Sequence, residues 1–109
     1  MENTIMRTML FDFYGDLLTD KQREYYDLHY NADLSLQEIA EQSGVSRQAV
    51  WDIIRRAEQS LVGFEDKTGL VSRAVRRRKA VEEIAEIVSR ISEGEEKRAI
   101  LARLDELND

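Results

Sequence analysis

The residues of this chain whose types and spacing suit ligand recognition lie around position 50. An arginine can bind guanine or a phosphate, and a glutamine can bind adenine through two hydrogen bonds. Arg47 and Gln48 are adjacent, and a tryptophan and a second arginine follow at intervals of one helical turn. On a helix these side chains share an outward face. The predicted nucleic-acid contacts are Ser46, Arg47, Gln48, Trp51 and Arg55.

Two residues on this face have more than one interpretation. Asp52 would face a polyanion unless it pairs with Arg55 or Arg56, or lies on a cytosine amino group. Trp51 is expected either to pack under a neighbouring helix or the C-terminal arm, to anchor a protein contact, or to touch nucleic acid. A protein contact suits tryptophan because its ring buries a large area at little entropic cost. The sequence leaves these alternatives open.

A second basic cluster occupies residues 73–79. Its predicted phosphate contacts are Arg73, Arg76, Arg77 and Lys79. Neighbouring residues on a helix are about 100° apart, so the four consecutive basic residues 76–79 cannot all face one phosphate backbone. The alternatives are therefore a solvated helix face, or pairing with the acidic residues that follow, Glu82, Glu83 and Glu86.

Catalytic and cofactor chemistry finds little support in the composition. The chain has no cysteine and one histidine, His29, which is expected at the surface or half-buried. Neither a thiolate nor a histidine-rich metal site is expected. With no glycine-rich phosphate loop either, we expect no enzyme, no metal and no cofactor. No stretch approaches the roughly 18 uncharged residues of a membrane span, so we expect a cytoplasmic protein without membrane insertion.

A helix-turn-helix is the expected support for the residues around position 50. Ser35 and Glu38 form a capping box that begins a short helix over 36–42. Gly44 supplies the left-handed turn, and Ser46 caps the next helix. That helix has an apolar stripe of Val50, Ile53, Ile54, Ala57 and Leu61, and the short one turns Leu36, Ile39 and Ala40 inward.

Two further helices are expected before this motif. The first covers residues 4–18 and is predicted to bury Ile5, Met9, Phe13 and Leu17 in a core or dimer contact, with Met6, Leu10 and Tyr14 widening its apolar face. The second begins at a capping box formed by Thr19 and Gln22. Its expected buried face is Tyr25, Tyr26 and Leu28, and residues 31–33 form a turn.

The C-terminal part is expected to be a helical arm or hairpin. Ala74, Val81, Ile84, Val88 and Ile91 follow a seam-like spacing. Gly94 marks a turn before a short helix with Ile100, Leu101, Leu104 and Leu107. Either this last helix folds back on the seam or a second copy covers it, and we expect a homodimer. The predicted fold is all-α, with a helix-turn-helix domain over 1–64 and the arm over 65–109.

Charge is distributed unevenly along these parts. The 109 residues carry a net charge of −6. Residues 1–34 carry −4, residues 35–64 carry −1, residues 65–79 carry +4 and residues 80–109 carry −5. An acidic average argues against broad, non-specific nucleic-acid binding. Any such contact must therefore be local.

Parts of the sequence resemble known families. From Leu18 to about Glu65 the chain is similar to region 4 of the sigma-70 factors, in Leu18-Thr19, Ser35–Ala40, Gly44–Arg47 and Val50. Most of the chain more closely resembles the YlxM proteins. The segments that carry this resemblance are Leu18–Gln22, Ser46–Asp52, Glu58 and Glu65–Leu70.

The resemblance implies a bacterial helix-turn-helix regulatory protein that binds DNA. It also implies an association with the signal recognition particle pathway, because genes of YlxM proteins lie beside those of the particle's GTPases. The alternative is an interaction module that binds a targeting-pathway protein or ribonucleoprotein without reading DNA. Sigma region 4 itself binds both DNA and protein, so the fold permits either function.

Overall fold

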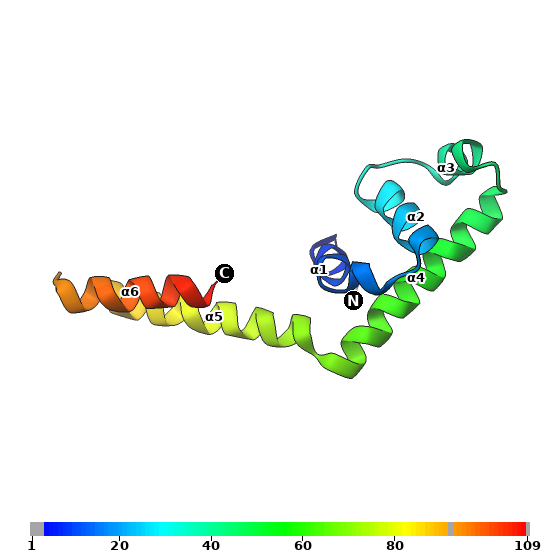
Figure 1. The fold of residues 1–109 in the computed structure, drawn as a ribbon. Coiled ribbons are helices and arrows are strands. Elements are labelled where there is room, and N and C mark those ends of the chain that lie inside the picture. The colour runs from blue at the N-terminus through cyan, green and yellow to red at the C-terminus, as the bar shows by residue number, and fades with distance from the viewer. Residues whose placement is uncertain (1–3, 92, 109) are drawn as a thin grey trace. The chain divides into compact units, whose positions relative to one another are not determined.

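The computed structural model describes residues 4–91 and 93–108, and its regular elements within those ranges are all helices (Figure 1). The chain divides into two compact units, Met1–Gly69 and Leu70–Asp109. The sequence placed this division at residue 64. Helix α4 continues past that position to Thr68 and is closed by Gly69 in the left-handed conformation (φ 65°).

The first unit is built around its longest helix. Its elements are α1 (Thr4–Tyr14), a 3₁₀ turn (Gly15–Leu17), α2 (Asp20–Tyr30), α3 (Leu36–Ser43) and α4 (Arg47–Thr68). The three shorter α-helices all pack against α4 (Figure 1). The core between them is apolar and tightly closed. Its fully buried members include Tyr25, Tyr26, Ile39, Val50, Ile54, Ala57 and Leu61.

The helix starts follow the predicted capping chemistry. Thr19 accepts a hydrogen bond from the backbone N–H of Gln22, whose side chain accepts one from the backbone N–H of Thr19. Ser35 and Glu38 form the same reciprocal pair at α3. Both capping boxes are confirmed. Each satisfies two backbone donors that a helix otherwise leaves without partners.

The predicted buried face of α1 is only partly correct, because Leu10 and Tyr14, which were expected to widen it, are buried, whereas three of its four central residues are not. Ile5, Phe13 and Leu17 are exposed, whereas Leu10, Tyr14 and Leu18 are buried. The helix also ends at Tyr14, so Leu17 lies in the 3₁₀ turn instead of continuing the stripe. Because apolar residues surround much of α1, spacing alone could not select the face that packs.

Contacts made by Arg7 and Tyr14 fix the orientation of α1. The Tyr14 hydroxyl donates to Glu65 Oε1 at 2.5 Å and lies 2.5 Å from Thr68 Oγ1, which ties the end of α1 to the end of α4. Near the start of α1, Arg7 lies over the Tyr30 ring, 4.2 Å from its centroid, and its Nε donates to Glu58 at 3.4 Å. These contacts require the face that carries Arg7 and Tyr14 to point inward.

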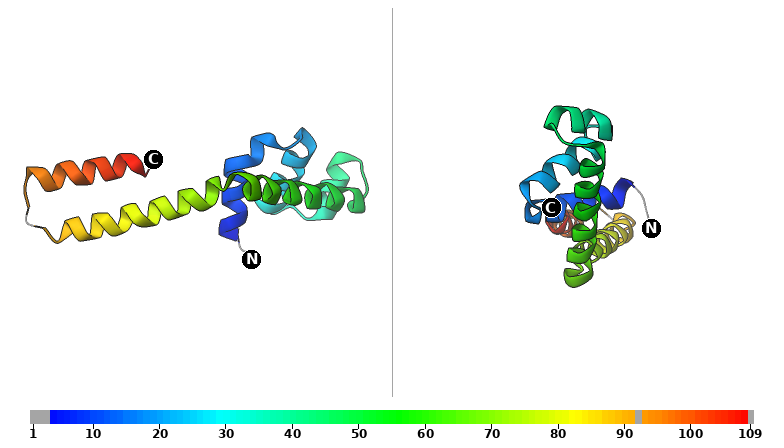
Figure 2. Two further views of the ribbon diagram at one scale, coloured as in Figure 1. Left: turned by 90° about the horizontal axis from the view of Figure 1, so that it is seen from below. Right: turned by 90° about the vertical axis from the view of Figure 1, so that its right-hand side faces the viewer.

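The second unit is a helical hairpin. Helix α5 (Leu70–Ser89) and helix α6 (Glu95–Leu107) lie side by side and antiparallel (Figure 2). At their tip the Lys97 ammonium donates to Ser89 O, Ile91 O and Glu93 Oε1. The last helix thus folds back on α5, which was one of the two expected arrangements.

The predicted seam of the hairpin is only half correct. Val81, Val88 and Leu104 are buried, whereas Ile84, Ile91, Ile100 and Leu107 are exposed. Ile84 and Ile91 each lie three residues beyond a buried valine, which rotates them about 60° from it around the helix. One neighbouring helix covers only one side of α5, so these isoleucines remain outside the contact with α6.

Candidate nucleic-acid interface

The turn between α3 and α4 sets the start of the candidate site. Gly44 has φ 71° and its N–H donates to Ala40 O at 2.9 Å, while Val45 N–H donates to the same carbonyl at 3.2 Å. Ser46 then caps α4 by accepting from Ala49 N–H at 3.0 Å. Buried Ile39 and Ala40 of α3 and buried Val50 and Ile54 of α4 hold the two helices together.

This packing turns the predicted contact residues outward. Ser46, Arg47, Gln48, Trp51 and Arg55 are all exposed on the first turns of α4. Within the described residues, no hydrogen bond or ion pair is found for the Arg47 side chain. An unengaged guanidinium beside the N-terminus of a helix adds to the positive end of the helix dipole. Both features favour an anion at this place.

Asp52 is neutralised by its own helix. Gln48 Nε2 donates to Asp52 Oδ1 at 3.1 Å, and Arg55 Nη2 lies 3.7 Å from the same oxygen. The sequence had left open whether Asp52 pairs with Arg55, pairs with Arg56 or lies on a base. In the free protein the partner is Arg55, and Gln48 joins it.

Trp51 is the largest apolar side chain on this face. It remains 37 % exposed, so neighbouring residues cover much of the ring but do not enclose it. A half-exposed tryptophan on a polar helix face is an available anchor for a binding partner.

The second basic cluster lies on α5. Arg73, Arg76, Arg77, Arg78 and Lys79 are all exposed, and Arg76 donates to Ser72 Oγ at 2.8 Å. The cluster surrounds the helix, as its consecutive spacing requires. Only part of it can face a single phosphate backbone.

A group formed by Arg7, Tyr30 and Glu58 was not predicted from the sequence. Arg7 interrupts an apolar helix, and its side chain is only 21 % exposed. The sequence did contain a signal for this group, which is a single charged residue on an otherwise apolar helix. A partly buried arginine needs an acidic or aromatic partner, so its position predicts one nearby. Burial, assisted by the nearby negative charge of Glu58, also raises the pKa of Tyr26 in this region.

His29 is half-buried, as expected. Its Nδ1 lies 2.8 Å from Leu34 O, in the segment that joins α2 to α3. That segment includes Asp33, which adopts a left-handed conformation with φ 62°. Aspartate tolerates this region better than most residues because its short side chain can bond locally. The histidine is therefore accounted for by a structural contact in the turn.

Comparison with known proteins identifies the family. A family model described as "Putative helix-turn-helix protein, YlxM / p13 like", the UPF0122 family, matches residues 1–101. The chain belongs to this family. The match extends well beyond the α3–α4 motif and takes in most of the hairpin, so the resemblance to the YlxM proteins is confirmed.

Two curated UPF0122 proteins match nearly the whole chain, and a third matches about two thirds of it. A UPF0122 protein of Geobacillus kaustophilus is 48 % identical over 109 residues, covering 99 % of both chains. One of Halalkalibacterium halodurans is 43 % identical over 107 residues, covering 98 % of both. A UPF0122 protein of Clostridium kluyveri is 56 % identical over 71 residues, which is 65 % of this chain and 64 % of its own.

The helices and acidic side chains of the described residues bear on membrane insertion and metal binding. Among the described residues, no helix is both long and apolar enough to span a bilayer. The same residues contain no group of three or more histidine, cysteine or acidic side chains arranged to hold a metal ion.

Proposed function

We propose that this UPF0122 protein binds DNA as a cytoplasmic bacterial regulator, with the first turns of α4 as its recognition element. The observation that carries the proposal is the exposed, unengaged guanidinium of Arg47 at the start of a capped helix whose other face is fully buried. In helix-turn-helix proteins the second helix enters the major groove with its N-terminal residues on the base edges.

Each residue of the face has a chemical role in this proposal. Arg47 contacts guanine or a phosphate, and Ser46 contacts the backbone beside it. Gln48 and Arg55 reach bases or phosphates only after leaving Asp52, which their bonds now neutralise. The basic residues Arg73, Arg76, Arg77 and Lys79 of α5 supply additional phosphate contacts.

The proposal is tested by titrating DNA fragments from around the protein's own gene, using anisotropy over a salt series. Arg47→Ala should weaken binding about tenfold to hundredfold, the size of one base contact. Arg90→Ala removes the same charge from an exposed arginine that pairs with Glu86 on α5, and should leave affinity within about twofold. Equal binding by wild type and Arg47→Ala would contradict the proposal.

A second function is favoured by Trp51. Its half-exposed ring and the acidity of the chain suit a protein partner, and the YlxM resemblance supports a component of the signal recognition particle. The test is binding to the particle's GTPase and to its RNA. Binding to the GTPase that survives Arg47→Ala and is lost in Trp51→Ala would support this function over DNA reading.

A homodimer completes the first proposal. Dimeric helix-turn-helix proteins read two half-sites, so the symmetry of the DNA site follows that of the protein. The support in this chain is the set of exposed isoleucines on α5, which a single hairpin leaves in contact with water.

A further inference from the structure

Asp52 is the only acidic residue near the start of α4. Residues 46–57 otherwise carry three arginines and no further acidic side chain. Asp52 lies about one helical turn after Gln48 and about one turn before Arg55, so the three side chains are neighbours on the helix surface. The Asp52 side chain remains 41 % exposed. A DNA groove that receives the first turns of α4 therefore also receives this carboxylate.

Gln48 and Arg55 engage one of the two carboxylate oxygens. Gln48 Nε2 donates to Asp52 Oδ1 at 3.1 Å, and Arg55 Nη2 lies 3.7 Å from the same atom. Among the described residues, no hydrogen bond to Asp52 Oδ2 is found. An ionised carboxylate has several acceptor positions on each oxygen. Asp52 can therefore accept a hydrogen bond from a ligand while Gln48 and Arg55 hold its side chain in place.

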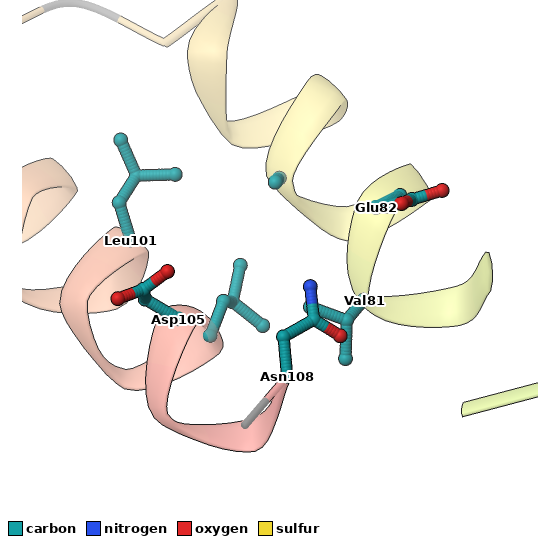
Figure 3. A pocket seen from close by; sticks show the side chains of 7 residues that line it. Val81, Glu82, Leu101, Asp105 and Asn108 are labelled. Atoms are coloured by element: carbon teal, nitrogen blue, oxygen red, sulfur yellow. The ribbon is translucent and has the colours of Figure 1, made fainter. Parts of the chain in front are cut away.

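Carboxylates in the second unit have a different setting. Glu82 and Asp105 line an open pocket together with Val81 and Leu101 (Figure 3). Of the described residues, those that line this pocket include no arginine or lysine. Asp52 differs because both of its neighbours on the helix are themselves proposed DNA contacts.

The base edges of DNA differ in whether they can satisfy a carboxylate. In the major groove guanine and thymine present only acceptor atoms, whereas adenine N6 and cytosine N4 carry amino groups that donate. Phosphate oxygens are acceptors and carry negative charge. Asp52 in its ionised form can accept but not donate. Against guanine, thymine or a phosphate, its exposed oxygen would lose water without gaining a donor, which costs free energy.

We propose that Asp52 is a specificity-determining residue that requires an amino-bearing base, cytosine or adenine, at the position it faces. This role rests on the proposed function and adds the base chemistry that α4 selects. Gln48 and Arg55 orient the carboxylate through Oδ1, and the amino group of the base donates to Oδ2. When Gln48 or Arg55 turns to the DNA, the same amino group compensates the charge they leave. Guanine and thymine are rejected at this position because they offer no donor.

The role of Asp52 is opposite in sign to that of Arg47. Truncation of Arg47 removes an attraction, so binding should weaken. Truncation of Asp52 removes a penalty, so binding to disfavoured sequences should strengthen. Both kinds of residue produce specificity, since specificity is a difference between two affinities.

Selection from a randomised DNA duplex tests the base requirement with wild type, Asp52→Ala and Glu86→Ala. Glu86→Ala is the matched control, because it also removes an exposed carboxylate that pairs with an arginine, Arg90 on α5. Sites selected by wild type and by the control should share a position restricted to adenine or cytosine on one strand, favoured about fivefold to hundredfold. Asp52→Ala should accept all four bases there within about threefold, and should bind guanine- and thymine-containing sites more tightly than wild type does.

Two failures are distinguishable in this selection. A restriction that persists in Asp52→Ala, or wild-type sites without any position restricted to amino-bearing bases, would overturn the role of Asp52 and leave DNA binding intact. A wild type that binds no DNA would overturn the proposed function and this role with it. Circular dichroism should show equal helicity for the three proteins, so that a change in base preference cannot come from unfolding.

Methylation of the selected base tests the amino group itself. In N6-methyladenine or N4-methylcytosine the methyl group replaces the hydrogen that faces the groove, and the remaining N–H keeps the base pair. Anisotropy titrations should show binding at least about fivefold weaker for wild type and changed less than about twofold for Asp52→Ala. Equal weakening of both proteins would overturn the proposal, because the methyl group would then be excluded by shape and not through Asp52.

Discussion

The two units of this chain differ in how completely they bury their apolar side chains. The first packs three helices against α4 and fully encloses a core that includes Tyr25, Ile54 and Leu61, although Ile5, Phe13 and Leu17 remain exposed. The second has two helices, and several of its isoleucines stay in contact with water. All of the chain's aromatic residues lie in the first unit. The comparison teaches that three helices around α4 close a core completely, whereas two helices leave even their most buried contact residues, Val81, Val88 and Leu104, slightly exposed.

The largest expected effect is the loss of stability when a core residue of either unit is truncated. Ile54→Ala in α4 should lower the free energy of unfolding by about 2–5 kcal/mol, because Ile54 is fully enclosed. Leu104→Ala in α6 should cost less, since its pocket opens to solvent and water can reach the space. Urea unfolding of each variant, followed by far-ultraviolet circular dichroism, gives the two values. Equal losses would show that the hairpin core is as closed as the first.

An intermediate effect should appear in alkaline solution and only in the first unit. The pKa of Tyr26 is raised above its ordinary value of 10.0, chiefly by burial. As the pH rises, the Tyr26 hydroxyl therefore loses its proton in the unfolded state before it does so in the folded state. The free energy of unfolding is unaffected by this group below pH 10 and falls above it. The unfolding equilibrium should shift by up to about tenfold for each pH unit above 10.

Denaturation at pH 8 to 11 measures this shift, with Tyr26→Phe as the control. In this variant the free energy of unfolding should fall less steeply above pH 10, because the contribution of Tyr26 is absent. An unchanged pH profile in Tyr26→Phe would show that another group controls it.

The smallest expected effect concerns two glycines in the first unit. Gly44→Ala should destabilise by about 1 kcal/mol, because its φ of 71° is strained for any residue with a Cβ. Gly63→Ala should stabilise by about 0.5–1 kcal/mol, since Gly63 lies within α4 and, apart from the adjoining helix backbone, no atom of the described residues lies within 4 Å of the added Cβ. Thermal unfolding of both variants shows the two signs. The same sign in both would contradict the conformational argument.

Sequence reasoning succeeded where the decisive interactions are local. Each capping box, at Thr19 and at Ser35, joins residues within four positions of one another, and so does the turn at Gly44. The family assignment was reachable for the same reason, since its motifs are short and contiguous.

It failed where a distant partner decides the outcome. The face of α1 depends on Tyr14 reaching Glu65 and on Arg7 reaching Tyr30, contacts between residues far apart in the chain. In the hairpin, the sequence could recognise apolar spacing but not which of two adjacent stripes would face α6. The exposed α4 contacts were predicted as a helix face, but the engagement of Gln48 and Arg55 with Asp52 depends on rotamers that spacing does not determine.

The position of Trp51 has a practical consequence. It is the only tryptophan in the chain, and it lies half-exposed on α4 among the proposed contact residues. Fluorescence excited selectively at tryptophan therefore comes from that surface alone, while the hairpin, with no aromatic residue, emits nothing. A ligand that covers this face of α4 can therefore be detected on the unlabelled protein as a change in tryptophan emission.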